Sequence, residues 1–209
     1  MRVTAQTKEE TRSRIVAAAR NLFSSKGFGN TTTRDLAATA KIATGTLFNY
    51  FPTKESLALT LLDEALEAGS SVFRDELNGD ESLEEALFAH IVAGLRQLRP
   101  HRTYVADVLE ATMTPFNVSA PNSPAERIRT RHLETVEELI RTHEPADGPG
   151  ASFVSIHVYW SLYLGILAFW SREPSPNQED TLVLVDQSMR LFVASLTTDH
   201  TNVEIGHES

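Results

Sequence analysis

Histidines and acidic residues have the most catalytic potential in this sequence, but their spacing supports no catalytic site. Among seven histidines, Glu204 and His207 form the one Glu-x-x-His pair typical of di-iron helical bundles, and it lies near the C-terminus. The sequence has no cysteine and no His-Glu-x-x-His, Gly-x-Ser-x-Gly, phosphate-loop or Gly-x-Gly-x-x-Gly pattern. We therefore expect no enzyme, no catalytic residue, no metal site and no cofactor. The histidines interpreted as surface or helix-end residues are His90, His101, His132 and His143.

Charge is divided unevenly along the chain. The formal net charge is −9, from 19 basic and 28 acidic side chains in 209 residues. Residues 1–55 carry nine Lys or Arg and four acidic residues, a net +5, whereas residues 56–209 carry −14. This split predicts a front end that binds a polyanion and a body that does not.

The elements that would position such groups are helices, because apolar residues recur at helical spacing and no segment reads as a strand. Capping-box spacing marks helix starts at Thr7–Glu10, Ser82–Glu85, Ser123–Glu126 and Ser175–Gln178, with a near match at Thr32–Asp35. Pro124 and Pro176 then fit the first helical position. About nine helices are predicted, over residues 7–25, 33–40, 44–50, 53–77, 82–98, 101–114, 124–143, 151–172 and 176–197.

We predict an all-α fold with two domains. A break in composition near residues 51–52 separates a domain over residues 1–52 from a larger helical domain over residues 53–198. Residues 199–209 are predicted to be a flexible tail.

The first domain has the pattern of a helix-turn-helix. Helices 33–40 and 44–50 are joined by the three-residue turn Lys41-Ile42-Ala43, and helix 7–25 offers an apolar stripe against which both can pack. So short a third helix is not stable alone. The other two helices must hold it, so its outward side chains are displayed on a fixed frame.

Two sequence runs carry a family resemblance: TTRDLA at residues 32–37 and GTLFNYFPTKESL at residues 45–57. They resemble the DNA-binding domain of TetR-family (tetracycline-repressor-like) transcriptional regulators, and the resemblance covers roughly residues 8–57. The remaining residues resemble that family only in length and helical layout. The resemblance implies an N-terminal helix-turn-helix domain followed by a ligand-binding and dimerisation domain.

The resemblance also implies roles for individual residues. The third helix would place its N-terminal end in the major groove, Asn49 and Tyr50 would reach phosphates or base edges, and Lys54 would anchor a phosphate. Leu36, Leu47 and Phe51 would be core. The implied DNA-binding residues are Thr32, Thr33, Thr44, Gly45, Thr46, Asn49, Tyr50 and Lys54.

Three positions depart from the usual family pattern. Lys41 stands where glycine is common, so we expect either a positive φ or an altered turn. Ala43 replaces a common capping serine, so we expect Thr44 to shift the cap by one residue. Phe48 replaces a common tyrosine, which removes one expected hydrogen bond to phosphate.

The last two predicted helices have the pattern of a dimer interface, similar to the four-helix interface of TetR-like proteins. In helix 151–172 small residues follow one face and bulky residues another. The alternative is that both helices are buried within one subunit. The residues expected at the interface are Val158, Ser161, Gly165, Ala168, Val185, Met189 and Phe192.

The resemblance implies a ligand pocket enclosed by the helices from 53–77 to 151–172. Its expected lining is apolar and aromatic, which favours a largely apolar inducer. Core packing is the alternative role for each of these residues. The candidates are Phe73, Phe88, Tyr104, Val108, Met113, Phe116, His157, Trp160 and Tyr163.

These features together predict a cytoplasmic homodimeric repressor that binds a palindromic operator in double-stranded DNA and is released by a small molecule. The alternative is a DNA-bound architectural or protein-recruiting factor without a ligand. Residues 151–170 are uncharged and long enough to span a membrane, but a buried helix gives the same pattern, so we expect no membrane partner. Residues 1–10 are polar, so we expect no signal peptide.

Overall fold

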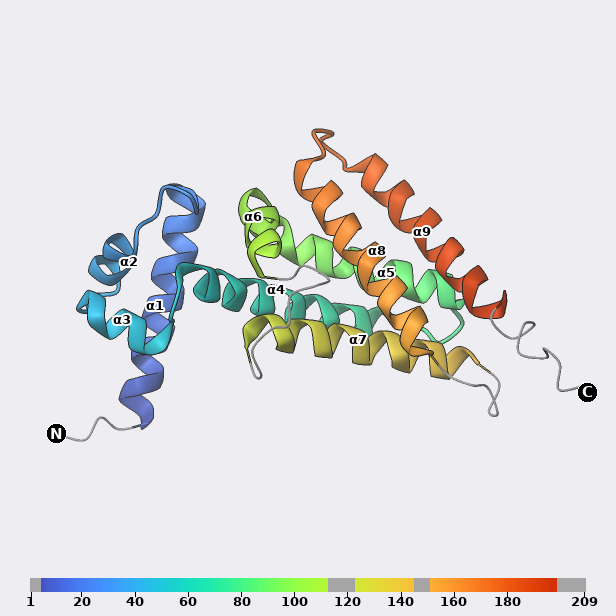
Figure 1. Ribbon diagram of the computed structural model, residues 1–209, viewed down its shortest axis with the longest axis horizontal. Helices are drawn as coiled ribbons and strands as arrows, with labels where there is room; N and C mark the ends of the chain where they lie inside the picture. Colours follow the sequence, from blue (N-terminus) through green and yellow to red (C-terminus); the bar gives the residue numbers. More distant parts are fainter. Residues whose placement is uncertain (1–4, 113–122, 145–150, 199–209) are drawn as a thin grey trace, which may run out of the picture. The chain divides into compact units, whose positions relative to one another are not determined.

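The computed structural model describes residues 5–112, 123–144 and 151–198, and within these ranges it contains helices and turns but no strand. The predicted all-α fold is confirmed (Figure 1). Residues 199–209 and the candidate ligand residues Met113 and Phe116 lie outside the described ranges. The helices are α1 (Ala5–Ser25), α2 (Thr33–Thr39), α3 (Thr44–Tyr50), α4 (Lys54–Glu76), α5 (Leu83–Leu98), the 3₁₀ helix η1 (Arg99–His101), α6 (Arg102–Thr112), α7 (Pro124–His143), α8 (Phe153–Arg172) and α9 (Glu179–Thr198).

Most helix starts follow the predicted local signals. The Thr32 side chain accepts the N–H of Asp35, and the Asp35 carboxylate accepts the N–H of Thr32, which completes a capping box at α2. Ser82 and Glu85 form the same reciprocal pair at α5, with distances of 2.8 and 3.3 Å. Pro124 is the first residue of α7. The prediction at Thr7 was wrong by two residues, because α1 already begins at Ala5.

The start of α9 differs from the prediction. The Ser175–Gln178 capping box does not form, and α9 begins at residue 179. Instead, the carboxylate of Glu173 accepts hydrogen bonds from the Ser175 hydroxyl (2.5 Å) and from the N–H groups of Asp180 (3.1 Å) and Thr181 (3.2 Å). A carboxylate at a helix N-terminus is a stronger partner than a hydroxyl. The end of α8 therefore caps α9.

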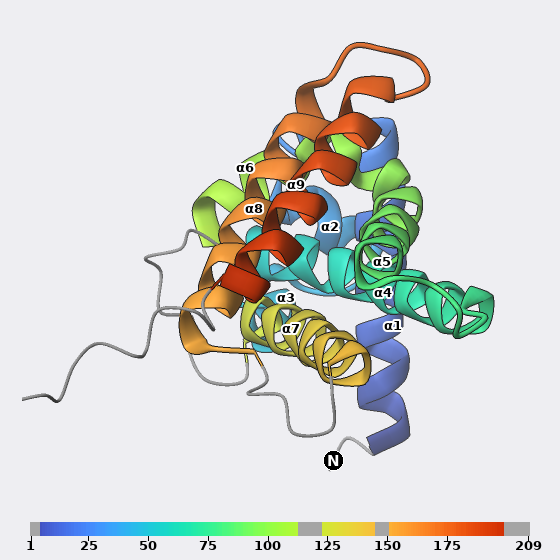
Figure 2. The ribbon, with the colours of Figure 1, turned by 90° about the vertical axis from the view of Figure 1, so that its right-hand side faces the viewer.

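The chain divides into two compact units. The first unit combines residues 1–67 with 97–128, and the second combines residues 68–96 with 129–209. In the first unit α1, α2 and α3 pack around Leu36, Leu47 and Phe51, each at most 5% exposed, as predicted. In the second unit α8 and α9 lie side by side (Figure 2).

Candidate nucleic-acid interface

The turn between α2 and α3 positions the third helix. The N–H of Ile42 donates to the carbonyl of Ala37 (3.0 Å), and the N–H of Lys41 donates to the carbonyl of Ala38 (3.1 Å). This pair of bonds defines a Schellman motif, which needs a left-handed residue directly after the cap. Lys41 supplies it with a φ of 56°, so the expected positive φ is confirmed.

Replacing Lys41 with glycine should raise the free energy of unfolding by about 1 kcal/mol, because glycine adopts the left-handed conformation without a steric penalty. Chemical denaturation of the full chain measures the change. The matched control is Lys8→Gly in the exposed helical backbone of α1, which should lower stability by about 1 kcal/mol. Equal effects at the two lysines would contradict a strained turn.

The cap of α3 stays at Ala43, so the prediction that Thr44 would shift it was wrong. Ala43 has extended backbone angles, and its carbonyl accepts the N–H groups of Thr46 (2.9 Å) and Leu47 (3.2 Å). No side chain caps the helix. Thr44 is therefore the first helical residue.

One face of α3 is free within the protomer. Gly45, Phe48 and Asn49 are exposed and share this face because they are three and four residues apart, whereas Leu47 is buried on the opposite side. We name Gly45, Phe48 and Asn49 the outer face of α3. The half-buried residues at its margins are Thr44, Thr46 and Tyr50.

The outer face of α3 includes one residue that the sequence did not assign to binding. Phe48 is 46% exposed, so its apolar ring is available for contact on this face. Its spacing of three residues from Gly45 is the signal that would have placed it there. Arg34 on α2 is also exposed and was not assigned.

Lys54 and Thr32 make contacts within the first unit. The ammonium of Lys54 donates to the carbonyls of Phe28 (2.8 Å) and Thr31 (3.2 Å) and lies 4.2 Å from the centre of the Phe28 ring. An ammonium has three donors, so these contacts occupy two of them. The N–H and hydroxyl of Thr32 are both engaged with Asp35 (2.9 and 2.8 Å). Both residues thus order the turn before α2 and the start of α4.

The one acidic residue of α2 is neutralised locally. The ammonium of Lys26 lies 2.6 Å from the carboxylate of Asp35. This hydrogen bond, together with those from Thr32, holds the pKa of Asp35 well below its usual range. Asp35 therefore stays ionised and paired near neutral pH. Arg34 on α2 and Lys41 in the turn between α2 and α3 remain exposed.

The candidate ligand residues fall into separate groups. Phe73, Trp160 and Tyr163 are buried in the second unit. Tyr104 and Val108 belong to the first unit, where the Tyr104 ring packs 5.5 Å from those of both Phe23 and Phe28. His157 is only half-buried and contacts Phe153.

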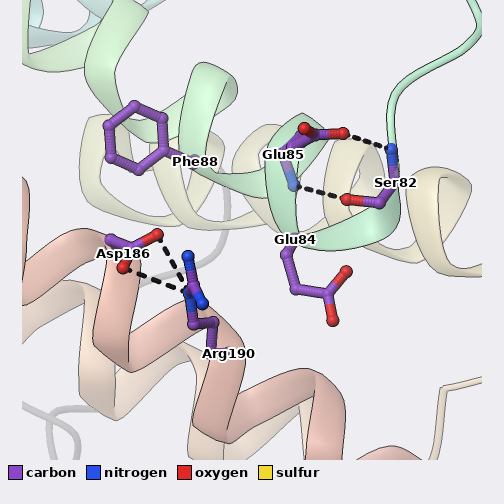
Figure 3. Close-up of a pocket in the computed structure, with 6 residues that line it drawn as sticks. All are labelled: Ser82, Glu84, Glu85, Phe88, Asp186 and Arg190. Atoms are coloured by element: carbon purple, nitrogen blue, oxygen red, sulfur yellow. Dashed lines mark hydrogen bonds and ion pairs between the residues drawn. The ribbon is translucent and has the colours of Figure 1, made fainter.

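Phe88 lies in a different place from the other aromatic candidates of the second unit. It lines a cavity of about 450 Å³ beside the start of α5 and the middle of α9 (Figure 3). Four of the polar residues that line it have partners within the chain, since Ser82 pairs with Glu85 and Asp186 pairs with Arg190. The close-up therefore shows Phe88 beside a polar cavity.

The interpretation as surface or helix-end residues was wrong for His90 and His132, which lie within α5 and α7, whereas His101 and His143 are the last residues of η1 and α7. His90, His101 and His132 are at most 8% exposed. Nδ1 of His101 lies 2.5 Å from the hydroxyl of Tyr104, and Nε2 of His132 lies 2.9 Å from that of Tyr159. These two tyrosine hydroxyls compensate for the burial of His101 and His132.

The expected dimer residues divide by exposure. Val158, Ser161, Gly165 and Ala168 of α8 are exposed. The residues expected on α9 require a correction, because Val185, Met189 and Phe192 are at most 1% exposed and pack inside the protomer. The exposed large apolar residues of α9 are Leu182, Val183 and Leu191. Among the described residues, α8 alone has the length and hydropathy of a membrane span.

The fold and the outer face of α3 define a helix-turn-helix DNA-binding protein with a helical second unit. Residues 15–61 match the description "Bacterial regulatory proteins, tetR family", and residues 87–204 match "Tetracyclin repressor-like, C-terminal domain". The chain belongs to the TetR family and is a DNA-binding transcriptional regulator.

Three known proteins illustrate what this chain is similar to. The transcriptional regulator UidR from Escherichia coli K12 is 24% identical over 142 residues, which are 68% of this chain and 69% of UidR. A TetR regulator from Rhodococcus sp. RHA1 has a TM-score of 0.70 at 19% identity over 90% of this chain and 98% of that chain. Thermus thermophilus FadR, a transcriptional repressor solved with lauroyl-CoA, has a TM-score of 0.61 at 21% identity, over 95% and 98% of the two chains.

Proposed function

We propose that this chain is a cytoplasmic homodimeric repressor that binds a palindromic operator through α3 and is released by a small, largely apolar ligand. The observation that carries the proposal is the outer face of α3, which is exposed and lies within residues 1–55, the segment that carries a net charge of +5. The acidic second unit would be repelled by DNA, which leaves the first unit to make contact.

Gly45 is the most informative residue of this face. A Cβ atom added at Gly45 would meet no atom within 4 Å, and its φ is not positive. Glycine costs up to about 1 kcal/mol relative to alanine in a helix, and no close contact among the described residues requires a glycine at this position. Close approach of the α3 backbone to DNA would explain a glycine here.

Gly45→Ala should therefore have opposite effects on folding and on binding. We expect the free energy of unfolding to rise by up to about 1 kcal/mol. We expect affinity for the operator to fall at least tenfold, about 1.4 kcal/mol, because the methyl group separates α3 from the groove. Thermal denaturation and a fluorescence anisotropy titration with a selected operator measure the two effects. A stabilised variant with unchanged affinity would argue against the outer face as the DNA-contacting surface.

The remaining assigned residues fit supporting roles. Thr44, Thr46, Asn49 and Tyr50 border or belong to the exposed face, where hydroxyl and amide groups can contact phosphates or base edges. Thr33 starts α2, where N–H groups favour an anion. Lys54, with two donors engaged, has one left for a phosphate, whereas Thr32 acts mainly by holding α2 in place.

The dimer would form through α8 and α9. The row of small exposed residues on α8 lets a second helix approach closely, and exposed Val154 and Leu191 would otherwise leave apolar surface in water. A second copy of the chain is a better partner for this face than lipid, because the other face of α8 is packed into the second unit and the family consists of DNA-binding regulators.

A ligand that binds one arrangement of the dimer more tightly would change DNA affinity. The aromatic interior of the second unit favours an apolar ligand. Operator release by a small molecule in a gel shift is the result expected. DNA binding that no small molecule affects would favour the architectural alternative.

A further inference from the structure

Among the described residues of the second unit, His90 is the buried polar side chain without a hydrogen-bond partner. It is 4% exposed, and neither Nδ1 nor Nε2 has a hydrogen-bond partner. A buried polar group without a partner costs about 1–3 kcal/mol. Such groups are rare in native proteins and often mark a place that a ligand or water completes.

A close helix crossing places His90. A Cβ atom on Gly69 of α4 would lie 2.9 Å from the Cα of Gly94 on α5, so the two backbones nearly touch. One helical turn from this crossing on each helix lie Phe73 and His90, whose ring centres are 5.0 Å apart. The crossing fixes these two side chains against each other.

The second neighbour of His90 is His132 of α7, with ring centres 4.6 Å apart. His132 differs from His90 because it has a partner, the hydroxyl of Tyr159, and its ring also stacks 4.0 Å from that of Tyr163. Nε2 of His132 therefore has a hydrogen-bond partner, whereas neither ring nitrogen of His90 has one.

The protonation state of His90 determines what it can bind. Burial, with a smaller contribution from the charge of Arg74, lowers the pKa of His90 to about 4. The ring is neutral at physiological pH, so one nitrogen donates a hydrogen bond and the other accepts one. A hydroxyl or amide, which can donate and accept, complements such a ring.

A cavity lies on the side of Phe73 that faces the end of α4 and the second half of α7. Its volume is about 390 Å³, which is within the range of small-molecule sites. Phe73, Leu77 and Leu139 form its apolar wall. Phe73 thus contacts both the cavity and His90, so rotation of its ring would join them.

We propose that this cavity, extended past Phe73 to His90, binds a small neutral apolar molecule with one hydroxyl or amide group, which hydrogen-bonds to His90. The inference rests on the proposed function in that it specifies the ligand of the second unit. The charged groups around the cavity argue against an anionic ligand, because Asp80, Glu81 and Glu138 outnumber Arg74. They would repel the phosphates of an acyl-CoA.

Matched probes test the proposal: 4-propylphenol and propylbenzene, which differ by one hydroxyl. We expect calorimetric titration of the full chain to show at least tenfold tighter binding of 4-propylphenol. His90→Phe should abolish this preference while keeping the fold, because a phenyl ring has no unpaired nitrogen. His101→Phe, a buried histidine of the first unit, should leave the preference unchanged.

Nuclear magnetic resonance of the wild-type chain with ¹⁵N-labelled histidine tests the contact without a variant. We expect 4-propylphenol, but not propylbenzene, to shift the nitrogen resonances of His90. Three results would overturn the proposal. The first is equal affinity for both probes, and the second is a preference for 4-propylphenol that survives in His90→Phe. The third is that the His90 resonances do not move at saturation, because a buried water then holds both nitrogens. Tighter binding of lauroyl-CoA at the same site would also overturn it.

The fate of the DNA complex separates this proposal from the proposed function. Release of the operator by a molecule whose action survives His90→Phe would support ligand control and overturn the His90 site. Binding of 4-propylphenol at His90 with no effect on DNA affinity would support the site and argue against ligand-controlled release.

Discussion

Replacing Glu173 with alanine is expected to lower the free energy of unfolding by about 3 kcal/mol. Glu173 is buried between α8 and α9, and its carboxylate accepts hydrogen bonds from the hydroxyls of Ser175 and Thr181 and from two N–H groups of the first turn of α9. Truncation leaves these donors without an acceptor and removes the negative charge at the helix N-terminus. Urea denaturation of the full chain measures the loss.

The control for this prediction is Glu179→Ala, an exposed carboxylate of the same turn, which should change stability by less than about 0.5 kcal/mol. Similar losses at both positions would show that general charge near α9, and not the buried network, stabilises the turn. Glu173→Gln should be intermediate, since an amide keeps one acceptor.

The same carboxylate should make stability depend on pH. Burial alone raises the pKa of Glu173, but the hydrogen bonds from Ser175, Thr181 and Asp180 outweigh it, so the pKa in the folded chain lies below the usual 4.5. The unfolded chain therefore binds the proton more readily, and the stabilisation is present above pH 4.5 and is lost as the pH falls through the folded value. Glu173→Gln should reduce this acid sensitivity. An unchanged acid transition would contradict the assignment.

Introducing leucine at Gly165 is expected to convert the proposed homodimer into a monomer. Gly165 lies in the exposed row of small residues on α8, and a Cβ atom there meets nothing within 4 Å in the protomer. The protomer should therefore fold normally, whereas the larger side chain holds two α8 helices apart. A monomer carries one α3 helix in place of two. Its affinity for the operator should be lower by about 100-fold or more, because binding of the second half-site is then no longer intramolecular.

Analytical ultracentrifugation and an operator titration measure these two effects. Glu137→Leu adds the same side chain at an exposed position of α7 and should leave both quantities unchanged. A Gly165→Leu variant that remains a dimer would place the interface elsewhere on the chain.

Local signals predicted the helices well because their chemistry is confined to a few residues. Thr32–Asp35, Ser82–Glu85 and Pro124 act within one helical turn, so the sequence is enough to predict their roles. Lys41 illustrates the same point, since its positive φ follows from the turn itself. The error at α9 arose because the capping group, Glu173, comes from the preceding helix.

The burial of α9 and of the histidines could not be predicted in the same way. Helical periodicity shows that Val185, Met189 and Phe192 share a face, but it cannot show whether that face meets the same subunit or a second one. His90 is buried because α4 and α5 cross at Gly69 and Gly94, a contact that neither helix reveals alone.

The central claim is that two copies of this chain bind a palindromic operator through α3. Footprinting of a selected operator at known protein stoichiometry tests this claim most directly. We predict two chains per operator and two symmetric protected half-sites about 34 Å apart, one turn of DNA. A single protected half-site bound by one chain would contradict the account.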